Sequence, residues 1–446
     1  MAAAADTGVV ARARRSVTLE TLVRPYTLLL VGAGLSLLAW VIPWGPAALL
    51  EFAHKQPLTL EGSLFLVGWY GFFFVVALGG FRLGQLIPPL PRAERVSWQS
   101  YYVYLSILSA VGTIYSYAYV LVKSPHAIAK ALEHQQFNTV RQILPEAAGI
   151  QTLRYAATLA AAIAVFELVR RRFRWLHIVN LVLLLLTAAV AARVSLIIAT
   201  IAVVALVARH LAGRRVNLRL AVGGLLLGAV ALFLALAALN YSRNAPYYRA
   251  NGVHDPMLMN LDEMIHYLGT PFQASVAVSN HVRDEPAVPS TATQGLSIFL
   301  LPTYGSSSTP RSVVNAENRY RKLVPSIPLS QTTNSVLVAA YGVFGALAFP
   351  VLGLVALVAA LVAGHASRYR SYAFLAGPVI AYCFSELWRV YNFNAGLIHF
   401  LVLALALWAV IGRDADRWSR GGWRAVMNLL LPEPHRPRSP RAPQQT

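Results

Sequence analysis

Long apolar runs alternate with short polar segments along most of the chain, and the polar segments are rich in arginine. A helix that crosses a lipid bilayer needs roughly 20 mostly apolar residues. Because the fifth and sixth apolar runs are separated only near Ala192 and Arg193, a single continuous helix there would reverse the orientation of every later span. We predict a membrane-spanning helix in each of ten runs: 26–42, 63–81, 100–122, 152–169, 175–191, 194–208, 220–240, 334–363, 369–386 and 394–411.

The composition agrees with a membrane-embedded chain. Of the 446 residues, 57% are apolar and 13% are charged, whereas an average soluble domain has about 25% charged residues. The one cysteine, Cys383, lies inside an apolar run, which excludes a disulfide within the chain, a thiolate zinc site and an iron–sulfur cluster. We therefore predict an all-α integral membrane protein rather than a soluble enzyme.

The formal charge of +20 is explained by the orientation of the spans. Such an excess of basic residues is also typical of nucleic-acid-binding proteins. Here, however, most of the basic residues lie before the first span, in alternate short loops and in the tail, as expected for cytoplasmic segments. We predict cytoplasmic termini and no nucleic-acid partner. The arginine-rich start and the apolar run Tyr26–Ile42 resemble a signal peptide, but further spans follow, so we interpret this run as an uncleaved first helix.

The predicted spans divide the chain into four parts. Residues 1–240 hold seven spans with short loops, and residues 241–333 form one large outward-facing loop. Residues 334–411 hold the last three spans, and residues 412–446 form a basic cytoplasmic tail. The loop is too long, aromatic and varied for a simple connection, so we expect it to form a small helical cap.

Local signals place helices in and beside this loop. Asp255 and Pro256 are typical of a helix start, and Met257–Leu268 then carries apolar residues at helical spacing. A second helix is expected from Arg311 to Val324.

Two further features concern the C-terminal part. The eighth span stays apolar from Asn334 to Ala363, about 45 Å at 1.5 Å per residue, so it must tilt or project. We expect Pro350 to kink it. In the tail, an interfacial helix is predicted at Trp418–Leu431.

Outward basic residues gather around the large loop, which suggests an anion site because arginine presents a planar fork of donors that matches phosphate oxygens. On a helix that begins at Arg311, the residues Asn315, Asn318 and Lys322 share one face with it. The alternative is a solvated helix with ordinary surface salt bridges. The outward basic residues are Arg193, Arg243, Arg249, Arg283, Arg311, Arg319, Arg321, Lys322 and Arg389.

Arg193 is the most specific of these residues. It lies between two apolar spans, where a charge is costly unless it reaches the membrane surface, pairs with a carboxylate or binds a ligand. A side chain that simply extends to the outer surface is the alternative to a phosphate ligand.

Acid–base chemistry has candidates on the first loop helix. Asp262 and His266 are four residues apart, so they share a face, and a carboxylate-oriented histidine is a plausible general base. A simple surface pair is the alternative. The other candidate bases are His254, Asp255, Glu263 and His281. Because no HExxH, DxD, P-loop, GxGxxG or GxSxG pattern stands in a useful context, we predict no metal and no cofactor.

Three parts of the chain together carry a resemblance to a known family. They are the hairpin 192–197, the loop segment 266–274 (HYLGTPFQA), and the segments 332–336 and 341–345. The chain resembles the Wzy-type O-antigen and exopolysaccharide repeat-unit polymerases. In that family the first part is similar to an arginine-containing junction, the second to a tyrosine- and glycine-bearing loop segment, and the third to the part that re-enters the membrane after the loop.

The resemblance implies a lipid-linked-donor, metal-independent glycosyltransferase of the bacterial inner membrane, with the large loop in the periplasm. It would transfer a growing glycan from undecaprenyl pyrophosphate to another lipid-linked repeat unit. Asp262 or His266 would activate the acceptor hydroxyl, although a retaining mechanism would need no such base. Tyr267 and Asn334 would contact sugars. The pyrophosphate would be bound by Arg193, Arg243, Arg249, Arg311, Arg319 and Lys322.

The resemblance also implies partners: the lipid-linked oligosaccharide, the bilayer, a chain-length regulator and a flippase. Two other functions remain open. An O-antigen ligase has a similar architecture but transfers glycan to lipid A core. A transporter or flippase usually carries ionisable or broken-helix elements at the membrane midplane, whereas the spans here are nearly free of charge.

Overall fold

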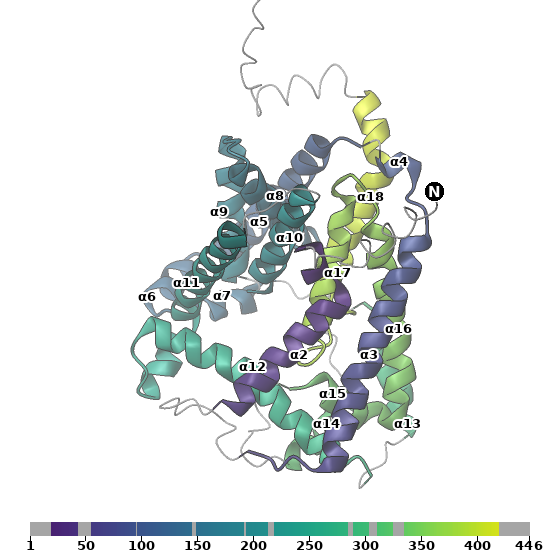
Figure 1. The fold of residues 1–446 in the computed structure, drawn as a ribbon. Helices are drawn as coiled ribbons and strands as arrows, with labels where there is room; N and C mark the ends of the chain where they lie inside the picture. The colour runs from purple at the N-terminus through teal and green to yellow at the C-terminus, as the bar shows by residue number, and fades with distance from the viewer. Residues whose placement is uncertain are drawn as a thin grey trace, which may run out of the picture.

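The structure is a computed structural model, and it describes residues 19–42, 55–94, 96–144, 149–190, 193–212, 218–283, 289–302, 310–323 and 334–418. These residues form helices and connecting segments and contain no β-strand, so the predicted all-α class is confirmed for this part of the chain. Figure 1 shows the helices gathered into one bundle-like body.

Each of the ten apolar runs is helical in the structure. Within the described part of the chain, six stretches are long and apolar enough to cross a membrane: Leu60–Leu86, Trp98–Lys123, Ile150–Val169, Val194–Leu211, Leu226–Ala250 and Val336–Ala366. Four shorter apolar helices occupy the other runs: Pro25–Val41, Trp175–Val190, Tyr372–Ser385 and Gly396–Gly412. Such a set of apolar helices is typical of a membrane-embedded protein.

The described residues form eighteen α-helices and four short 3-10 helices in chain order. The α-helices are α1 Leu19–Leu22, α2 Pro25–Val41, α3 Leu60–Leu86, α4 Pro91–Glu94, α5 Trp98–Lys123, α6 Ala127–Glu133, α7 Asn138–Ile143, α8 Ala156–Val169, α9 Trp175–Val190, α10 Val194–Leu211, α11 Leu218–Ala250, α12 Pro256–Asn280, α13 Pro289–Leu300, α14 Arg311–Asn318, α15 Val336–Phe344, α16 Ala348–Ala366, α17 Ala376–Ser385 and α18 Gly396–Trp418. The 3-10 helices are η2 Ile150–Tyr155, η3 Tyr320–Leu323, η4 Gly345–Leu347 and η5 Tyr372–Leu375.

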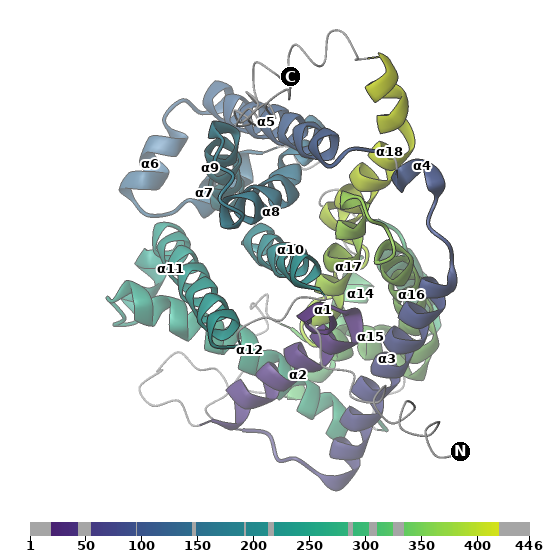
Figure 2. The same ribbon diagram turned by 45° about the horizontal axis from the view of Figure 1, so that its top comes forward.

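The helices form two groups joined through the middle of the molecule. Figure 2 shows α5, α8 and α9 together on one side and α2, α3, α16 and α17 on the other. α10 packs against α8 and α17, so it connects the two groups. α12 packs against α11, α2 and α3 and passes beneath α10 in Figure 1.

Glycines bring α3 and α16 into close contact. A Cβ at Gly80 would lie 2.7 Å from the carbonyl oxygen of Leu357, and one at Gly84 would collide with the carbonyl of Leu361. Gly364 meets the backbone of Phe81 in the same way. Small residues allow helix backbones to approach closely where van der Waals packing drives association in a membrane.

The seventh apolar helix is longer than the sequence predicts. The expected loop begins at residue 241, but α11 continues to Ala250 and includes Pro246. Proline has no N–H and therefore frees the carbonyl four residues earlier. That carbonyl, of Ser242, accepts a hydrogen bond from the N–H of Phe137 at 3.2 Å, so the helix continues without an unsatisfied group there.

α12 begins as expected and extends much further. The Asp255 carboxylate accepts from the N–H groups of Met257 and Leu258, which confirms the N-cap, and Pro256 is the first helical residue. The helix passes through Pro271, and the Ser36 hydroxyl donates to the carbonyl of Leu268 in the preceding turn at 2.7 Å. α12 is thus packed into the bundle and is not a separate peripheral cap.

Two helix boundaries differ from the predictions. The eighth apolar run breaks at Gly345, whose φ of 57° suits glycine, and not at Pro350. Pro350 lies in the first turn of α16, where its missing N–H has no helical partner in any case. The second loop helix ends as α14 at Asn318 and is followed by η3. The predicted interfacial helix 418–431 lies outside the described residues except for Trp418.

Candidate functional site

An ion pair joins two largely covered charges near the predicted loop. Arg193, at the N-cap position of α10, contacts the carboxylate of Glu263 on α12 through its Nη2 atom. The side chains are 21% and 6% exposed, respectively. A charge is tolerated at such a depth only when it is paired or bound. The pair therefore fixes the start of α10 against the middle of the α12 surface.

A second arginine lies near this pair, and a third lies over the ring of Tyr267. Arg243 of α11 is buried, and its charge acts on those of Arg193 and Glu263. Its Nε atom donates to Oδ1 of Asn138 at 2.7 Å. Arg389, in the segment between α17 and α18, lies with its guanidinium 5.1 Å from the centre of the Tyr267 ring.

We call Arg193, Arg243 and Arg389, together with Glu263 and Tyr267, the arginine cluster. Tyr267 lies near each of the three arginines. Its side chains come from α11, α12, the start of α10 and the segment after α17. In Figure 2, α10 lies between α11 and α17, and α12 packs against α11 and α2.

The charges within the cluster are only partly balanced. Arg389 donates to Oε2 of Glu386 through Nε at 2.9 Å and Nη2 at 2.5 Å. Tyr248 of α11 is buried beside Arg193 and Glu263 and acts electrostatically on both. Three guanidinium groups thus face two carboxylates, which leaves a net positive charge available to an anion.

Two buried polar atoms beside the pair lack hydrogen-bond partners. Among the described residues, Oε2 of Glu263 and the hydroxyl of Ser195 are both buried and unpartnered. Ser195 follows Arg193 by two residues, in the first turn of α10. Buried polar groups are nearly always satisfied by protein, water or ligand. The two atoms therefore provide an acceptor and a hydroxyl for a polar ligand.

Burial changes the pKa of two groups at this site. Burial alone would lower the pKa of Arg193, but the adjacent Glu263 carboxylate outweighs it and the net pKa is raised. The guanidinium therefore stays charged. Burial raises the pKa of Asp262 above its ordinary value, because the ionised form is poorly solvated there.

The predicted pair of Asp262 and His266 does not form. Asp262 makes no hydrogen bond or ion pair within the described residues, whereas Nδ1 of His266 lies 3.4 Å from the hydroxyl of Thr270. The two side chains share a helix, but their rotamers do not bring them into contact. Their catalytic roles stay predictions.

The remaining predicted phosphate ligands lie apart from the arginine cluster. Arg249 is exposed and donates to the Tyr241 hydroxyl at 2.6 Å, with its guanidinium 5.3 Å from that ring. Arg311 and Lys322 are exposed, and Arg319 is half-buried. No hydrogen bond or ion pair given for the described residues joins Arg311 or Lys322 to Arg193.

The basic stripe expected on the second loop helix is interrupted. It requires one continuous α-helix through Lys322, but α14 ends at Asn318 and η3 has a different rotation per residue. Glu317 of α14 is half-buried against α15, and burial raises its pKa to about 7. It makes no hydrogen bond or ion pair among the described residues.

The two predicted sugar contacts, Tyr267 and Asn334, lie at different places: Tyr267 is on α12, and Asn334 precedes α15 and lies beside a later part of α12. Tyr267 is half-buried beneath Arg389. Asn334 accepts the N–H of Ser335 at 2.9 Å, and the hydroxyl of Ser275 on α12 donates to the Ser335 hydroxyl at 2.8 Å. Asn334 is therefore placed beside the C-terminal half of α12, about two turns beyond Tyr267.

From the sequence, Glu263 was predicted as a candidate base and Arg389 as an outward basic residue. Their places in the arginine cluster were not predicted. The available signal was a charge in apolar surroundings: Glu263 occurs on a half-apolar helix face, and Arg389 lies between two apolar runs. Nothing local indicated that Glu263 would be the partner of Arg193. Among the described residues, no three His, Cys, Asp or Glu side chains form a group that could hold a metal ion.

Comparison with known proteins identifies no similar protein. The chain matches no protein-family model, no curated protein and no solved structure.

Proposed function

We propose that this chain is a glycosyltransferase of the bacterial inner membrane that polymerises undecaprenyl-pyrophosphate-linked oligosaccharide repeat units at the periplasmic face. In this proposal all ten apolar helices cross the membrane, both termini are cytoplasmic, and the residues between α11 and α15 are periplasmic. The arginine cluster is the observation that carries the proposal.

The charge of the cluster suits the leaving group of this reaction. A lipid pyrophosphate carries several negative charges, and without a metal they need fixed cations in a site shielded from water. Arg193, Arg243 and Arg389 are buried or largely covered and are held by neighbouring side chains. Such preorganised guanidinium groups need little rearrangement when charge develops on the departing oxygen.

The proposed reaction exchanges one bond at the anomeric carbon. A hydroxyl of the acceptor repeat unit forms the new bond to that carbon, and the bond from the carbon to the pyrophosphate oxygen breaks. Undecaprenyl pyrophosphate leaves with the bonding electrons, and the acceptor hydroxyl loses its proton. Asp262 and His266 are the predicted bases, and Oε2 of Glu263 is a third acceptor for the proton because it is buried without a hydrogen-bond partner among the described residues.

The test is a reconstituted extension assay. Purified protein in lipid vesicles is incubated with one lipid-linked repeat unit and no second acceptor. We expect a ladder of longer lipid-linked glycans. No product with the repeat unit alone, but transfer when lipid A core is added, would instead identify a ligase.

Variants separate the enzyme from a transporter. In vesicles that hold this protein alone, the wild type should extend glycans without moving the lipid-linked unit across the membrane, and Arg193→Ala should abolish chain growth. Movement of the lipid-linked unit by the wild type with no chain growth would show that the glycosyltransferase proposal is wrong. Arg311→Ala tests whether the site extends to α14: the arginine cluster predicts a small effect, whereas an extended basic surface predicts a large one.

A further inference from the structure

A second basic site lies at the other end of the helices that hold the arginine cluster. Arg193 and Arg209 stand at opposite ends of α10, about 24 Å apart at 1.5 Å per residue. Beside Arg209 is a cavity of about 600 Å³ between α5, α8, α10 and η5, and three more arginines line it: Arg170, Arg172 and Arg370.

The cavity has more positive charge than its carboxylate balances. Glu167 is the acidic residue in its wall, and it pairs with Arg170 at 3.3 Å and with Arg172 at 3.7 Å. Within the described residues, the guanidinium groups of Arg209 and Arg370 have no carboxylate at salt-bridge distance, and their like charges act on each other. The Glu94 carboxylate accepts a hydrogen bond from the backbone N–H of Arg370 at 3.2 Å. Glu20 and Glu94 act on Arg209 only at longer range.

Aromatic rings hold two of the guanidinium groups in position. Arg209 lies 4.4 Å from the ring centre of Phe374, and Arg170 lies 5.5 Å from that of Phe166. Both rings also line the cavity. Cation–π contacts restrict the arginine side chains while leaving N–H donors for an anion.

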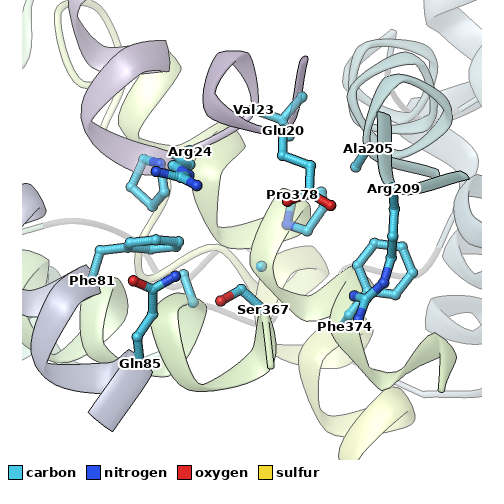
Figure 3. Close-up of a pocket in the computed structure, with 13 residues that line it drawn as sticks. Glu20, Val23, Arg24, Phe81, Gln85, Ala205, Arg209, Ser367, Phe374 and Pro378 are labelled. Carbon is cyan, nitrogen blue, oxygen red and sulfur yellow. The ribbon is translucent and has the colours of Figure 1, made fainter. Parts of the chain in front are cut away.

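A smaller cavity adjoins the basic one. Arg209 and Phe374 line both, and the smaller cavity has a volume of about 120 Å³. Figure 3 shows Arg209 alongside Phe374 at one edge of this space, with Phe81, Pro378 and Glu20 among the other walls. The rings of Phe81 and Pro378 offer nonpolar contact to a ligand that carries both a phosphate and hydrocarbon.

We propose that the basic cavity binds a phosphate-bearing anion, supplied by the headgroup of an acidic phospholipid. Basic pockets between helices on the positively charged side of membrane proteins are suited to such headgroups. Two guanidinium groups without carboxylate partners provide the charge, and their planar donor forks match phosphate oxygens. Inorganic phosphate has the same chemistry and is the alternative source. The site is independent of the proposed glycosyl transfer.

The test measures lipid retention by the full chain. Wild-type protein in detergent is titrated with phosphatidylglycerol, phosphatidylcholine or inorganic phosphate and followed by native mass spectrometry and thermal unfolding. In the double variant Arg209→Gln/Arg370→Gln, we expect phosphatidylglycerol binding to weaken about tenfold or more, because two charge-assisted contacts are lost. Phosphatidylcholine binding should not change.

The control removes the same charge from the same end of the molecule but outside the cavity. Arg82 is exposed, and Arg368 donates to the carbonyl of Gln85; neither lines the cavity. Arg82→Gln/Arg368→Gln should weaken phosphatidylglycerol binding less than about twofold if binding needs the cavity. Arg370→Gln alone, at an exposed side chain, should show an intermediate loss and covers the case in which the double variant does not fold.

The outcomes distinguish a phospholipid headgroup from free phosphate, and both from the absence of a specific site. Stabilisation by inorganic phosphate that depends on Arg209 and Arg370, with no selective phosphatidylglycerol binding, supports the phosphate site and identifies a free anion as its ligand. Equal losses in the cavity and control variants, or no selectivity for either phosphate compound, overturn the proposal. None of these measurements requires chain extension.

Discussion

Arg193 and Glu263 form a buried ion pair that links the start of α10 to α12. Two helices that the sequence would place in separate layers, a membrane span and a loop helix, are thereby held in one site. The pair uses one carboxylate oxygen, and the other oxygen is buried without a hydrogen bond among the described residues. The arrangement orients the guanidinium while leaving donors for a ligand.

Breaking this pair from one side should be costly. Arg193→Gln leaves the Glu263 carboxylate buried without its partner, so we expect a loss of roughly 3–5 kcal/mol in the free energy of unfolding. The double variant Arg193→Met/Glu263→Leu should recover much of that stability but no chain extension, because the cation is still absent. Denaturant titration in detergent measures the first effect and the ladder assay the second.

An exposed ion pair provides the control. Nε of Arg283 lies 2.8 Å from Oε1 of Glu61, and the two side chains are 82% and 54% exposed. Arg283→Gln should therefore change stability by about 0–1 kcal/mol. Equal losses for Arg193→Gln and Arg283→Gln would show that the buried pair has no special role.

The ring of Tyr267, rather than its hydroxyl, should position Arg389. Tyr267→Phe keeps an aromatic face beneath the guanidinium, whereas Tyr267→Leu removes it. A cation–π contact contributes about 0.5–2 kcal/mol, so the Leu variant should raise KM for the lipid-linked donor about 2- to 30-fold. The Phe variant should stay near wild type. Equal effects of Phe and Leu would instead assign the role to the hydroxyl, as a direct sugar contact.

The helices were predictable because their signals are local. Every apolar run became a helix, and the Asp255 N-cap formed as expected because a carboxylate followed by proline acts within one turn. The kink expected at Pro350 was wrong because proline is harmless in a first turn, and Gly345 five residues earlier supplies the break. Both Pro350 and Gly345 are helix-breaking residue types, and the local sequence did not indicate which of the two would end a helix.

The site was less predictable because it is built from distant contacts. The continuation of α11 past Pro246 depends on Phe137, which lies far away in sequence and donates to the freed carbonyl. The partner of Arg193 likewise depends on how α12 packs beneath α10. Of the six basic residues expected to bind pyrophosphate, Arg193 and Arg243 come together, whereas Arg249 instead contacts Tyr241.

Two glycines of α3, five residues apart, should respond oppositely to the same substitution. At Gly84 a Cβ would collide with the backbone of Leu361, so Gly84→Ala must separate α3 from α16. A Cβ at Gly79 meets nothing within 4 Å, so Gly79→Ala should be neutral or stabilising by up to about 1 kcal/mol through helix propensity. We expect Gly84→Ala to lose about 1–3 kcal/mol, as in other overpacked interiors. Thermal unfolding of both variants measures the difference, and similar melting temperatures would contradict the packing.

Glu317 should make the protein less stable as the pH rises. Burial raises its pKa to about 7 from an ordinary 4.5, and the close approach of α14 to Gly342 of α15 accounts for that burial. Between these values the folded state keeps a proton that the unfolded state has released, so unfolding becomes easier as pH rises through this window.

Glu317→Gln removes the titrating group and should flatten this dependence. At pH 5 the variant and the wild type should have similar stability, because the native carboxyl is then protonated. At pH 8 the variant should be more stable by about 1–3 kcal/mol, since one pKa unit corresponds to about 1.4 kcal/mol and partial exposure reduces the effect. Glu61→Gln, at an exposed carboxylate of α3, is the control for removing a surface carboxylate. A Glu317→Gln variant whose advantage is the same at pH 5 and pH 8 would show that this carboxyl does not titrate in the window, and thus that α14 does not bury it against α15.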